Sequence, residues 1–268
     1  MEETRPCVIT LSTDFGLEDP YVGVMKGVIL GINPRARIVD LTHALSHHRL
    51  KEAAFILSSA YAYFPPGTVH LAIVDPGVGG ERRILVVHDR QGIWIAPDNG
   101  ILTLVLRNHP RADIFHLTNR KFFLKEISST FHGRDIMAPT AAHISLGTPP
   151  DALGEKVHDP VLLEFPEPQQ TEDRLLGQVL WADHFGNLIT NINREMIVRT
   201  NPEGRPTVRI DGRTIGRIHS TYSDVPREAL LALIGSTGYL EIACNQGRAA
   251  DRLGYRSDHV MAVEVCFE

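Results

Sequence analysis

This 268-residue sequence has few cysteines, few aromatic residues and no excess of basic charge. Cys7, Cys244 and Cys266 lie far apart and form no CxxC pair, so we expect neither a disulfide framework nor a cysteine zinc site. The 27 lysines and arginines are outnumbered by 32 aspartates and glutamates, and the arginines are scattered. A basic face for binding nucleic acid is therefore not expected.

Long hydrophobic runs are missing as well. No run approaches the ~20 apolar residues of a membrane span, and residues 1–5 are too polar for a signal peptide, so we expect a cytoplasmic protein with no membrane partner. His43, His47 and His48 form an HxxxHH pattern that could offer two imidazoles to a metal. No acidic residue follows at a zincin-like spacing, however, and we expect no metal there.

Strands and helices alternate through the first part of the chain. Short apolar runs at 7–12, 37–42 and 70–74 predict strands, whereas the spacing of apolar residues predicts helices at 21–32 and 50–63. A strand pair at 84–88 and 92–96 and helices from 101 and 136 follow. This alternation predicts an α/β fold class: an N-terminal Rossmann-like domain over residues 1–165, with a parallel-rich sheet.

The second part of the chain has a different character. Residues 147–173 contain five prolines and no long periodic run, which is typical of a linker. Seven short strand-like runs follow, and Asp211-Gly212 is a good two-residue hairpin turn. Short strands with regular turn signals predict a small antiparallel β-barrel domain over residues 172–268.

Three predicted strands end in an aspartate beside a glycine turn. Asp14, Asp75 and Asp98 occupy these positions, and each by itself is typical of a turn or a helix N-cap. Parallel strands carry their carboxyl ends to one edge of a sheet, where open α/β folds bind their ligands. Arg82 follows Asp75 by seven residues and could fold back over the same opening.

Six motifs in this order resemble one family. They are STDFG (12–16), VDPGVGGERR (74–83), PDNG (97–100), FHGRDI (131–136), DHFGNLITNI (183–192) and LIGSTGYLEIACNQG (233–247). With the two-domain layout, they closely resemble the S-adenosyl-L-methionine (SAM) hydroxide adenosyltransferases, relatives of fluorinase and chlorinase, over essentially the whole chain. The resemblance implies that water or hydroxide displaces the sulfonium at C5′ of the ribose, so that SAM hydrolysis releases adenosine and L-methionine.

The resemblance also implies roles for single residues. The catalytic Asp–Arg–His set of the water-using branch falls on Asp75, Arg82 and His132, and this set favours water over a halide. The substrate-binding positions are Asp14 for the ribose hydroxyls, Asp183 for the methionine ammonium, Asn187 for adenine, Ser236 for the methionine carboxylate, Phe131, Phe185 and Tyr222 as pocket aromatics, and Gly133 beside the catalytic histidine. His48, where halogenases have a tryptophan, and Arg248, where relatives often have asparagine, depart from the pattern.

The implied chemistry agrees with these residue types. Methionine leaves a sulfonium as a neutral thioether, so departure needs neither an acid nor a metal, and no cofactor is expected. The difficulty lies in the nucleophile, which an arginine and an imidazole can hold and polarise. Whether His132 or Arg82 activates the water stays open, with a preference for His132 as the proton acceptor. The resemblance further implies a homotrimer, or a dimer of trimers, with active sites between subunits.

Other functions stay open at this point. A halide-using, chlorinase-like SAM adenosyltransferase is one alternative. A metal-dependent phosphoesterase is another, in which Asp14, Asp75 and Asp98 would hold Mg²⁺. A third is a non-catalytic SAM-binding module, but this would give the Asp75–Arg82–His132 set no purpose.

Overall fold

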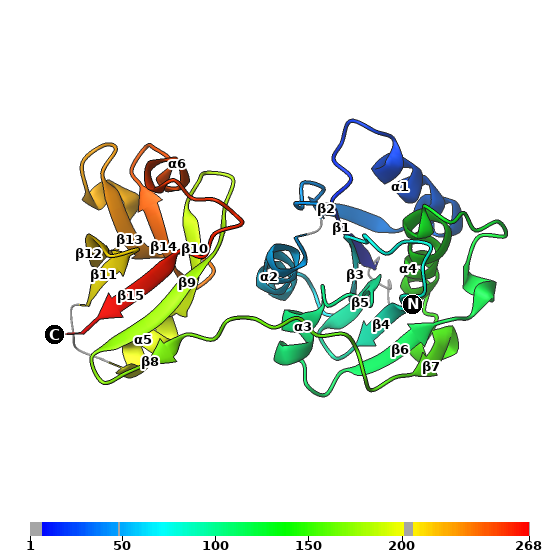
Figure 1. Cartoon of the computed structure of the whole chain (residues 1–268). Helices are drawn as coiled ribbons and strands as arrows, with labels where there is room; N and C mark the ends of the chain where they lie inside the picture. Colours follow the sequence, from blue (N-terminus) through cyan, green and yellow to red (C-terminus); the bar gives the residue numbers. More distant parts are fainter. Residues whose placement is uncertain (1–6, 48, 201–205, 268) are drawn as a thin grey trace, which may run out of the picture. The chain divides into compact units, whose positions relative to one another are not determined.

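The computed structural model describes residues 7–47, 49–200 and 206–267, in which the chain forms two compact units, Met1–Leu163 and Glu164–Glu268 (Figure 1). Each unit has its own hydrophobic core. His48, which belongs to the HxxxHH pattern and stands where halogenases have a tryptophan, lies outside the described residues. No helix in the described part of the chain is long and apolar enough to cross a membrane.

The first unit is built on a seven-stranded sheet with the strand order β2-β1-β3-β5-β4-β6-β7. Strands β2, β1, β3 and β5 run parallel to one another, whereas β4 pairs antiparallel with β5, and β6 and β7 continue the antiparallel edge. The strands are β1 (Val8–Thr13), β2 (Arg37–Thr42), β3 (Thr68–Ile73), β4 (Ile84–His88), β5 (Gly92–Pro97), β6 (Asp113–Leu117) and β7 (Gly154–Lys156).

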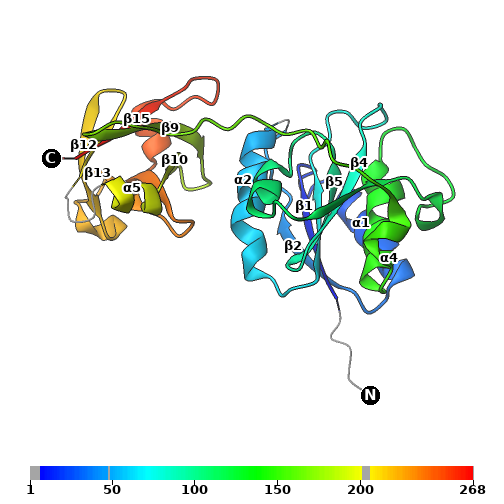
Figure 2. The same cartoon turned by 90° about the horizontal axis from the view of Figure 1, so that it is seen from below.

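Four α-helices cover this sheet on both faces. Helices α1 (Tyr21–Ile32) and α4 (Ala138–Ser145) pack on one face, and α2 (Leu50–Ala60) and α3 (Thr103–Asn108) pack on the other; Figure 2 shows the two layers on either side of the strands. Helix α1 buries Val22, Met25 and Ile29, which share one face because they lie three and four residues apart. The predicted Rossmann-like α/β domain is confirmed.

The second unit is a closed barrel of seven strands. Their order is β10-β14-β13-β12-β11-β15-β9, the pairing of β9 with β10 closes the ring, and β8 adds to β9 from outside. Only β12 and β13 pair in parallel among the described strands of this unit, so the predicted antiparallel barrel is confirmed. The elements are β8 (Gln169–Gln170), β9 (Arg174–Ala182), β10 (Leu188–Asn193), α5 (Arg194–Thr200), β11 (Thr207–Ile210), β12 (Arg213–His219), β13 (Leu230–Ile234), β14 (Tyr239–Cys244), α6 (Ala249–Leu253) and β15 (Ala262–Cys266).

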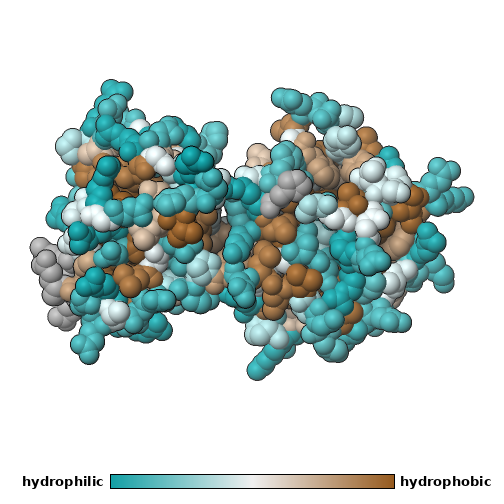
Figure 3. All heavy atoms as spheres, in the orientation of Figure 1, coloured by the Kyte–Doolittle hydropathy of each residue, from teal (hydrophilic) through white to brown (hydrophobic). Residues whose placement is uncertain are grey.

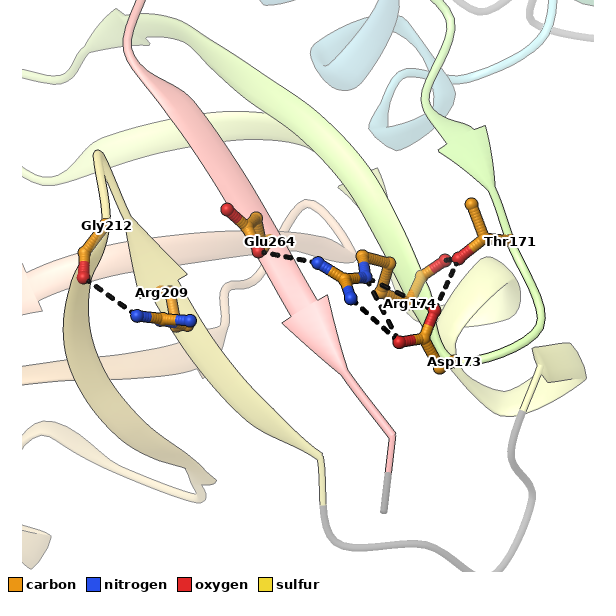
Figure 4. A network of polar contacts seen from close by, with 6 residues as sticks. All are labelled: Thr171, Asp173, Arg174, Arg209, Gly212 and Glu264. Atoms are coloured by element: carbon orange, nitrogen blue, oxygen red, sulfur yellow. Dashed lines mark hydrogen bonds and ion pairs between the residues drawn. The ribbon is translucent and has the colours of Figure 1, made fainter.

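Local chemistry fixes the register of the barrel strands. Asp211 and Gly212 have φ angles of 44° and 75°, the left-handed pair that a two-residue hairpin between β11 and β12 requires. Arg174 on β9 pairs with Asp173 at 2.8 Å and with Glu264 on β15 at 3.5 Å (Figure 4). These ion pairs near the surface each contribute at most about 1 kcal/mol, so they add little to the stability of the barrel.

Several segments differ from the sequence prediction. The helix predicted over 50–63 ends at Ala60, and a 3₁₀ turn (Tyr61–Tyr63) completes it. Strands β6 and β7 were not predicted, because β6 interrupts its apolar residues with Asp113 and His116 and β7 contains no large apolar residue. The stretch predicted as a linker begins inside the first unit, since its 3₁₀ turn (Pro150–Leu153) and β7 pack onto the sheet edge.

Candidate active site

Asp14 and Asp75 lie beside one pocket at the carboxyl edge of the first sheet. Strand β1 runs parallel to β3 with Thr13 opposite Ile73, so the residues that follow both strands emerge together. A pocket of about 410 Å³ opens at this edge. It is lined by Asp14, Phe15, Asp19, Tyr21, His47, Ile73, Asp75, Pro76, Val78, Thr130, Phe131, His132 and Gly133.

Asp75, Arg82 and His132 form a continuous chain of hydrogen bonds at this pocket. Arg82 donates from Nε to Asp75 Oδ2 at 3.0 Å, and its Nη2 lies 2.5 Å from the same oxygen. The Arg82 Nη2 also lies 2.9 Å from His132 Nδ1. Because the side chains of Asp75 and Arg82 are only 5% and 12% exposed, this two-point ion pair is held rigidly and little screened by water.

The protonation of His132 follows from this contact. A guanidinium can only donate, so Nδ1 must accept, and the single proton of the neutral imidazole then sits on Nε2. Burial and the positive charge of Arg82 lower the pKa of His132, against a smaller raising effect of nearby carboxylates and of the Ser128 backbone. The neutral ring is therefore the stable form, and its lone pair at Nδ1 is already used by Arg82.

The loop that carries His132 is anchored from below. The Asp135 carboxylate is fully buried and accepts hydrogen bonds from the backbone N–H and the hydroxyl of Ser128, both at 2.8 Å, and from Arg134. Gly133 opens a π-helical turn (Gly133–Met137), and a Cβ atom there would lie 2.9 Å from the Ile73 side chain. The absence of a side chain thus lets His132 sit directly over the end of β3.

A second close approach joins the two loops of the triad. Gly79 has a φ of +77°, and a Cβ atom there would lie 2.1 Å from the carbonyl oxygen of Ser129. Only glycine fits this position, because other residues rarely adopt the left-handed conformation and none has room for its side chain. The glycine turn after Asp75 therefore packs against the loop before His132, which sets the distance between them.

Asp14 and three aromatic rings form the other side of the pocket. His47 Nδ1 lies 3.3 Å from Asp14 Oδ2. The rings of Phe15, Tyr21 and Phe131 pack edge to face or tilted, with centroids 5.3–5.8 Å apart. An apolar wall of aromatic rings beside a carboxylate is suited to a ligand with both a hydrophobic ring and hydroxyl groups.

Asp98, the third strand-end aspartate, serves the fold. Its carboxylate accepts a hydrogen bond from Arg83 Nε at 2.7 Å and another from the Val161 backbone N–H at 2.8 Å, and its side chain is 3% exposed. Asp14, Asp75 and Asp98 therefore each have a different partner. Among the described residues, no three His, Cys, Asp or Glu side chains gather as a metal-binding group would require.

The second unit carries the remaining predicted residues. The Asp183 carboxylate follows β9 and accepts hydrogen bonds from the backbone N–H of Asn187 at 2.8 Å and from its side-chain amide at 3.0 Å. Phe185, between them, is 72% exposed. Ser236 lies exposed in the tight turn between β13 and β14. Tyr222 begins a 3₁₀ turn (Tyr222–Asp224), and its hydroxyl lies 3.2 Å from Glu241 Oε2.

Comparison with known proteins decides the family. The SAM hydroxide adenosyltransferase N-terminal domain matches residues 9–154, and the C-terminal domain of the same family matches residues 177–261. The chain belongs to the SAM hydroxide adenosyltransferase family. A relative from Thermus thermophilus, (R)-S-adenosyl-L-methionine hydrolase, is 40% identical over 251 residues, which cover 91% of this chain and 94% of the relative.

More distant relatives carry the name fluorinase. A fluorinase from Nocardia brasiliensis is 28% identical over 278 residues, covering 92% of each chain. The crystal structure of an uncharacterized conserved protein from Thermotoga maritima superposes with a TM-score of 0.88 at 36% identity, covering 96% of this chain and 99% of the other. The family resemblance read from the six motifs is thus confirmed over both units.

The structure places several further residues at the site that the sequence motifs did not single out for these positions. Phe15 and Tyr21 line the pocket, and Phe15 directly follows Asp14 in the STDFG motif, so adjacency alone could have suggested it. His47 contacts Asp14, a pairing that only the fold brings together. Glu241 is buried beside Tyr222, inside a motif whose serine had drawn attention instead.

Proposed function

We propose that this chain hydrolyses SAM to adenosine and L-methionine by displacement at C5′ of the ribose. The observation that carries the proposal is the half-buried Asp75–Arg82–His132 chain of hydrogen bonds beside a pocket that also holds Asp14 and an aromatic wall. The hydrolase name of the Thermus relative at 40% identity supports water as the nucleophile.

The reaction needs an aligned water more than a strong base. The water oxygen forms a bond to C5′ while the C5′–S electron pair moves to sulfur, which leaves as the neutral thioether of methionine. The water becomes acidic as the new bond forms, so a carboxylate suffices to take its proton. Holding the water in line behind C5′ supplies much of the rate, because oriented reactants reach effective molarities of ~10⁵ M or more.

We assign the three residues different tasks. Asp75 faces the pocket, orients the water and accepts its proton, whereas Arg82 fixes Asp75 and adds positive charge beside the developing hydroxide. His132 holds Arg82 through Nδ1. This division differs from the sequence-based preference for His132 as proton acceptor, because its Nδ1 lone pair faces Arg82 rather than a free site.

Substrate contacts are proposed from the family pattern together with local geometry. Asp14 would bind the ribose hydroxyls beside Phe131, and Gly133, which has no side chain, would let the ribose ring approach the sheet. In the second unit, Asp183 would meet the methionine ammonium. The remaining proposed contacts are Asn187 to adenine, Ser236 to the methionine carboxylate, and Phe185 and Tyr222 as aromatic walls.

A homotrimer with active sites at subunit interfaces completes the proposal, together with a cytoplasmic location. Leu17, Tyr63 and Phe185 are 75%, 82% and 72% exposed, and Figure 3 shows hydrophobic side chains between hydrophilic ones on the drawn face. In a trimer, a neighbouring subunit would bury an exposed aromatic such as Phe185, which is proposed to bind substrate. Light scattering coupled to gel filtration should give three chain masses, or six for a dimer of trimers.

The deciding experiment is chromatography of SAM incubated with the purified protein. Parallel tubes contain no chloride, added chloride, EDTA, or H₂¹⁸O. We expect adenosine and methionine in every tube, and ¹⁸O at the 5′ position of adenosine in the last. A 5′-chloro product would instead indicate the halide-using alternative. Loss of activity in EDTA would indicate a metal, which this reaction does not need.

A further inference from the structure

Glu241 is a buried carboxyl that the proposed mechanism does not use. It lies on β14 between Leu240 and Ile242, whose side chains belong to the barrel core. Successive strand residues point to opposite faces, so Glu241 points out of the barrel, yet it is only 6% exposed. Burial at this position comes from neighbouring turns, and those turns carry the residues proposed to bind substrate.

Two contacts and one nearby charge link Glu241 to these turns. Its Oε2 accepts a hydrogen bond from the Tyr222 hydroxyl at 3.2 Å. A Cβ atom placed on Gly235 would lie only 1.6 Å from Glu241 Oε1. The carboxyl therefore lies against the backbone just before Ser236. Asp183 is close enough for its charge to raise the pKa of Glu241.

The charge of Glu241 has no cation to balance it in these contacts. Burial raises the pKa of the carboxyl most, the Tyr222 hydrogen bond lowers it, and the Asp183 charge raises it further. A glutamine would accept the same hydrogen bond without the cost of burying a charge beside another carboxylate. A carboxylate placed here is best explained by a cation that arrives with a ligand.

We infer that Glu241 is a second acidic residue for the substrate's ammonium, acting together with Asp183 to position the amino-acid end of SAM. The inference rests on the proposed function and adds to it a residue in the barrel unit. Tyr222 orients the carboxyl, and Gly235, at the start of the turn that carries Ser236, packs directly against it. The ammonium supplies a positive charge, which none of these contacts gives to Glu241.

The test compares two substrates on the full-length protein. SAM carries the amino-acid end, whereas 5′-deoxy-5′-(dimethylsulfonio)adenosine keeps the nucleoside and the sulfonium without it. For Glu241→Gln we expect the KM of SAM to rise roughly tenfold with kcat unchanged, and the KM of the truncated substrate to stay the same. Glu241→Asp, which restores the charge, should recover part of the loss.

A matched control uses another strand carboxylate of the same barrel. Glu264→Gln removes a charge that pairs with Arg174 and should leave both KM values unchanged (Figure 4). An unaltered KM of SAM in Glu241→Gln would overturn the inference, and so would an equal rise for both substrates, because the loss would then lie at the nucleoside end. If the unsubstituted protein forms no adenosine, the proposed function itself fails, which is visible before any substitution is made.

Discussion

The role of His132 can be decided by replacing it with asparagine and, separately, with alanine. The asparagine Oδ1 stands where Nδ1 of the imidazole stands, so it can still accept the hydrogen bond that Arg82 Nη2 gives at 2.9 Å. Alanine removes that acceptor. A hydrogen bond to a charged group contributes about 1.5–3 kcal/mol, so we expect kcat to fall roughly 10- to 150-fold in His132→Ala and much less in His132→Asn.

The pH dependence adds a second test of the same residue. The pKa of His132 is lowered from its usual range, and only the neutral ring can accept from Arg82, so activity is present above that pKa and is lost as pH falls through it. His132→Asn should lack this acidic limb while keeping most of the rate, measured as kcat and kcat/KM between pH 5 and 9. If His132 were instead the general base, kcat would fall about 10²–10⁴-fold in both variants, and that result would refute the assignment.

Four further predictions follow from the geometry. Asp75→Asn should abolish turnover while SAM still binds by calorimetry, and joint loss of binding in a folded variant would contradict its catalytic role. Asp14→Ala should weaken SAM binding first, and unchanged affinity would remove it from the ribose site. Asp98→Ala should lower the free energy of unfolding in urea by about 2 kcal/mol, with kcat retained, because it leaves Arg83 partly unpaired in the fold. Burial lowers the pKa of His70 from 6.5 to about 4, so the fold loses stability as pH falls from 6.5 towards 4. The free energy of unfolding should be lower at pH 5 than at pH 7 by roughly 2 kcal/mol, and His70→Gln should reduce this loss.

Local patterns were enough to predict most of the elements. Helix α1 begins and ends where apolar spacing placed it, and the Asp211-Gly212 turn has the φ angles that its residues favour. These features depend on neighbours along the chain, so a sequence reveals them. Strands β6 and β7 could not be predicted in this way, because they gain their stability from pairing with a sheet edge formed elsewhere in the chain.

The residues of the candidate site also divide into those that the motifs predicted and those whose role only the fold reveals. The six motifs identified the family and named Asp75, Arg82 and His132 before any geometry was known. Asp98 supports the fold because its carboxylate binds Arg83, which lies beside it at the paired ends of β4 and β5, and the backbone N–H of Val161. The contact with Val161 joins segments far apart along the chain, so spacing does not reveal it.

The sequence by itself determined the fold class, the family and the residue types of the reaction, since these follow from periodicity and from motifs read in order. Tertiary structure alone decided which nitrogen of His132 faces Arg82 and which carboxyl is buried beside Tyr222. Hydrogen-bond direction and desolvation depend on atoms brought together from distant segments, and for this reason only the folded chain could assign His132 and Glu241 their proposed tasks.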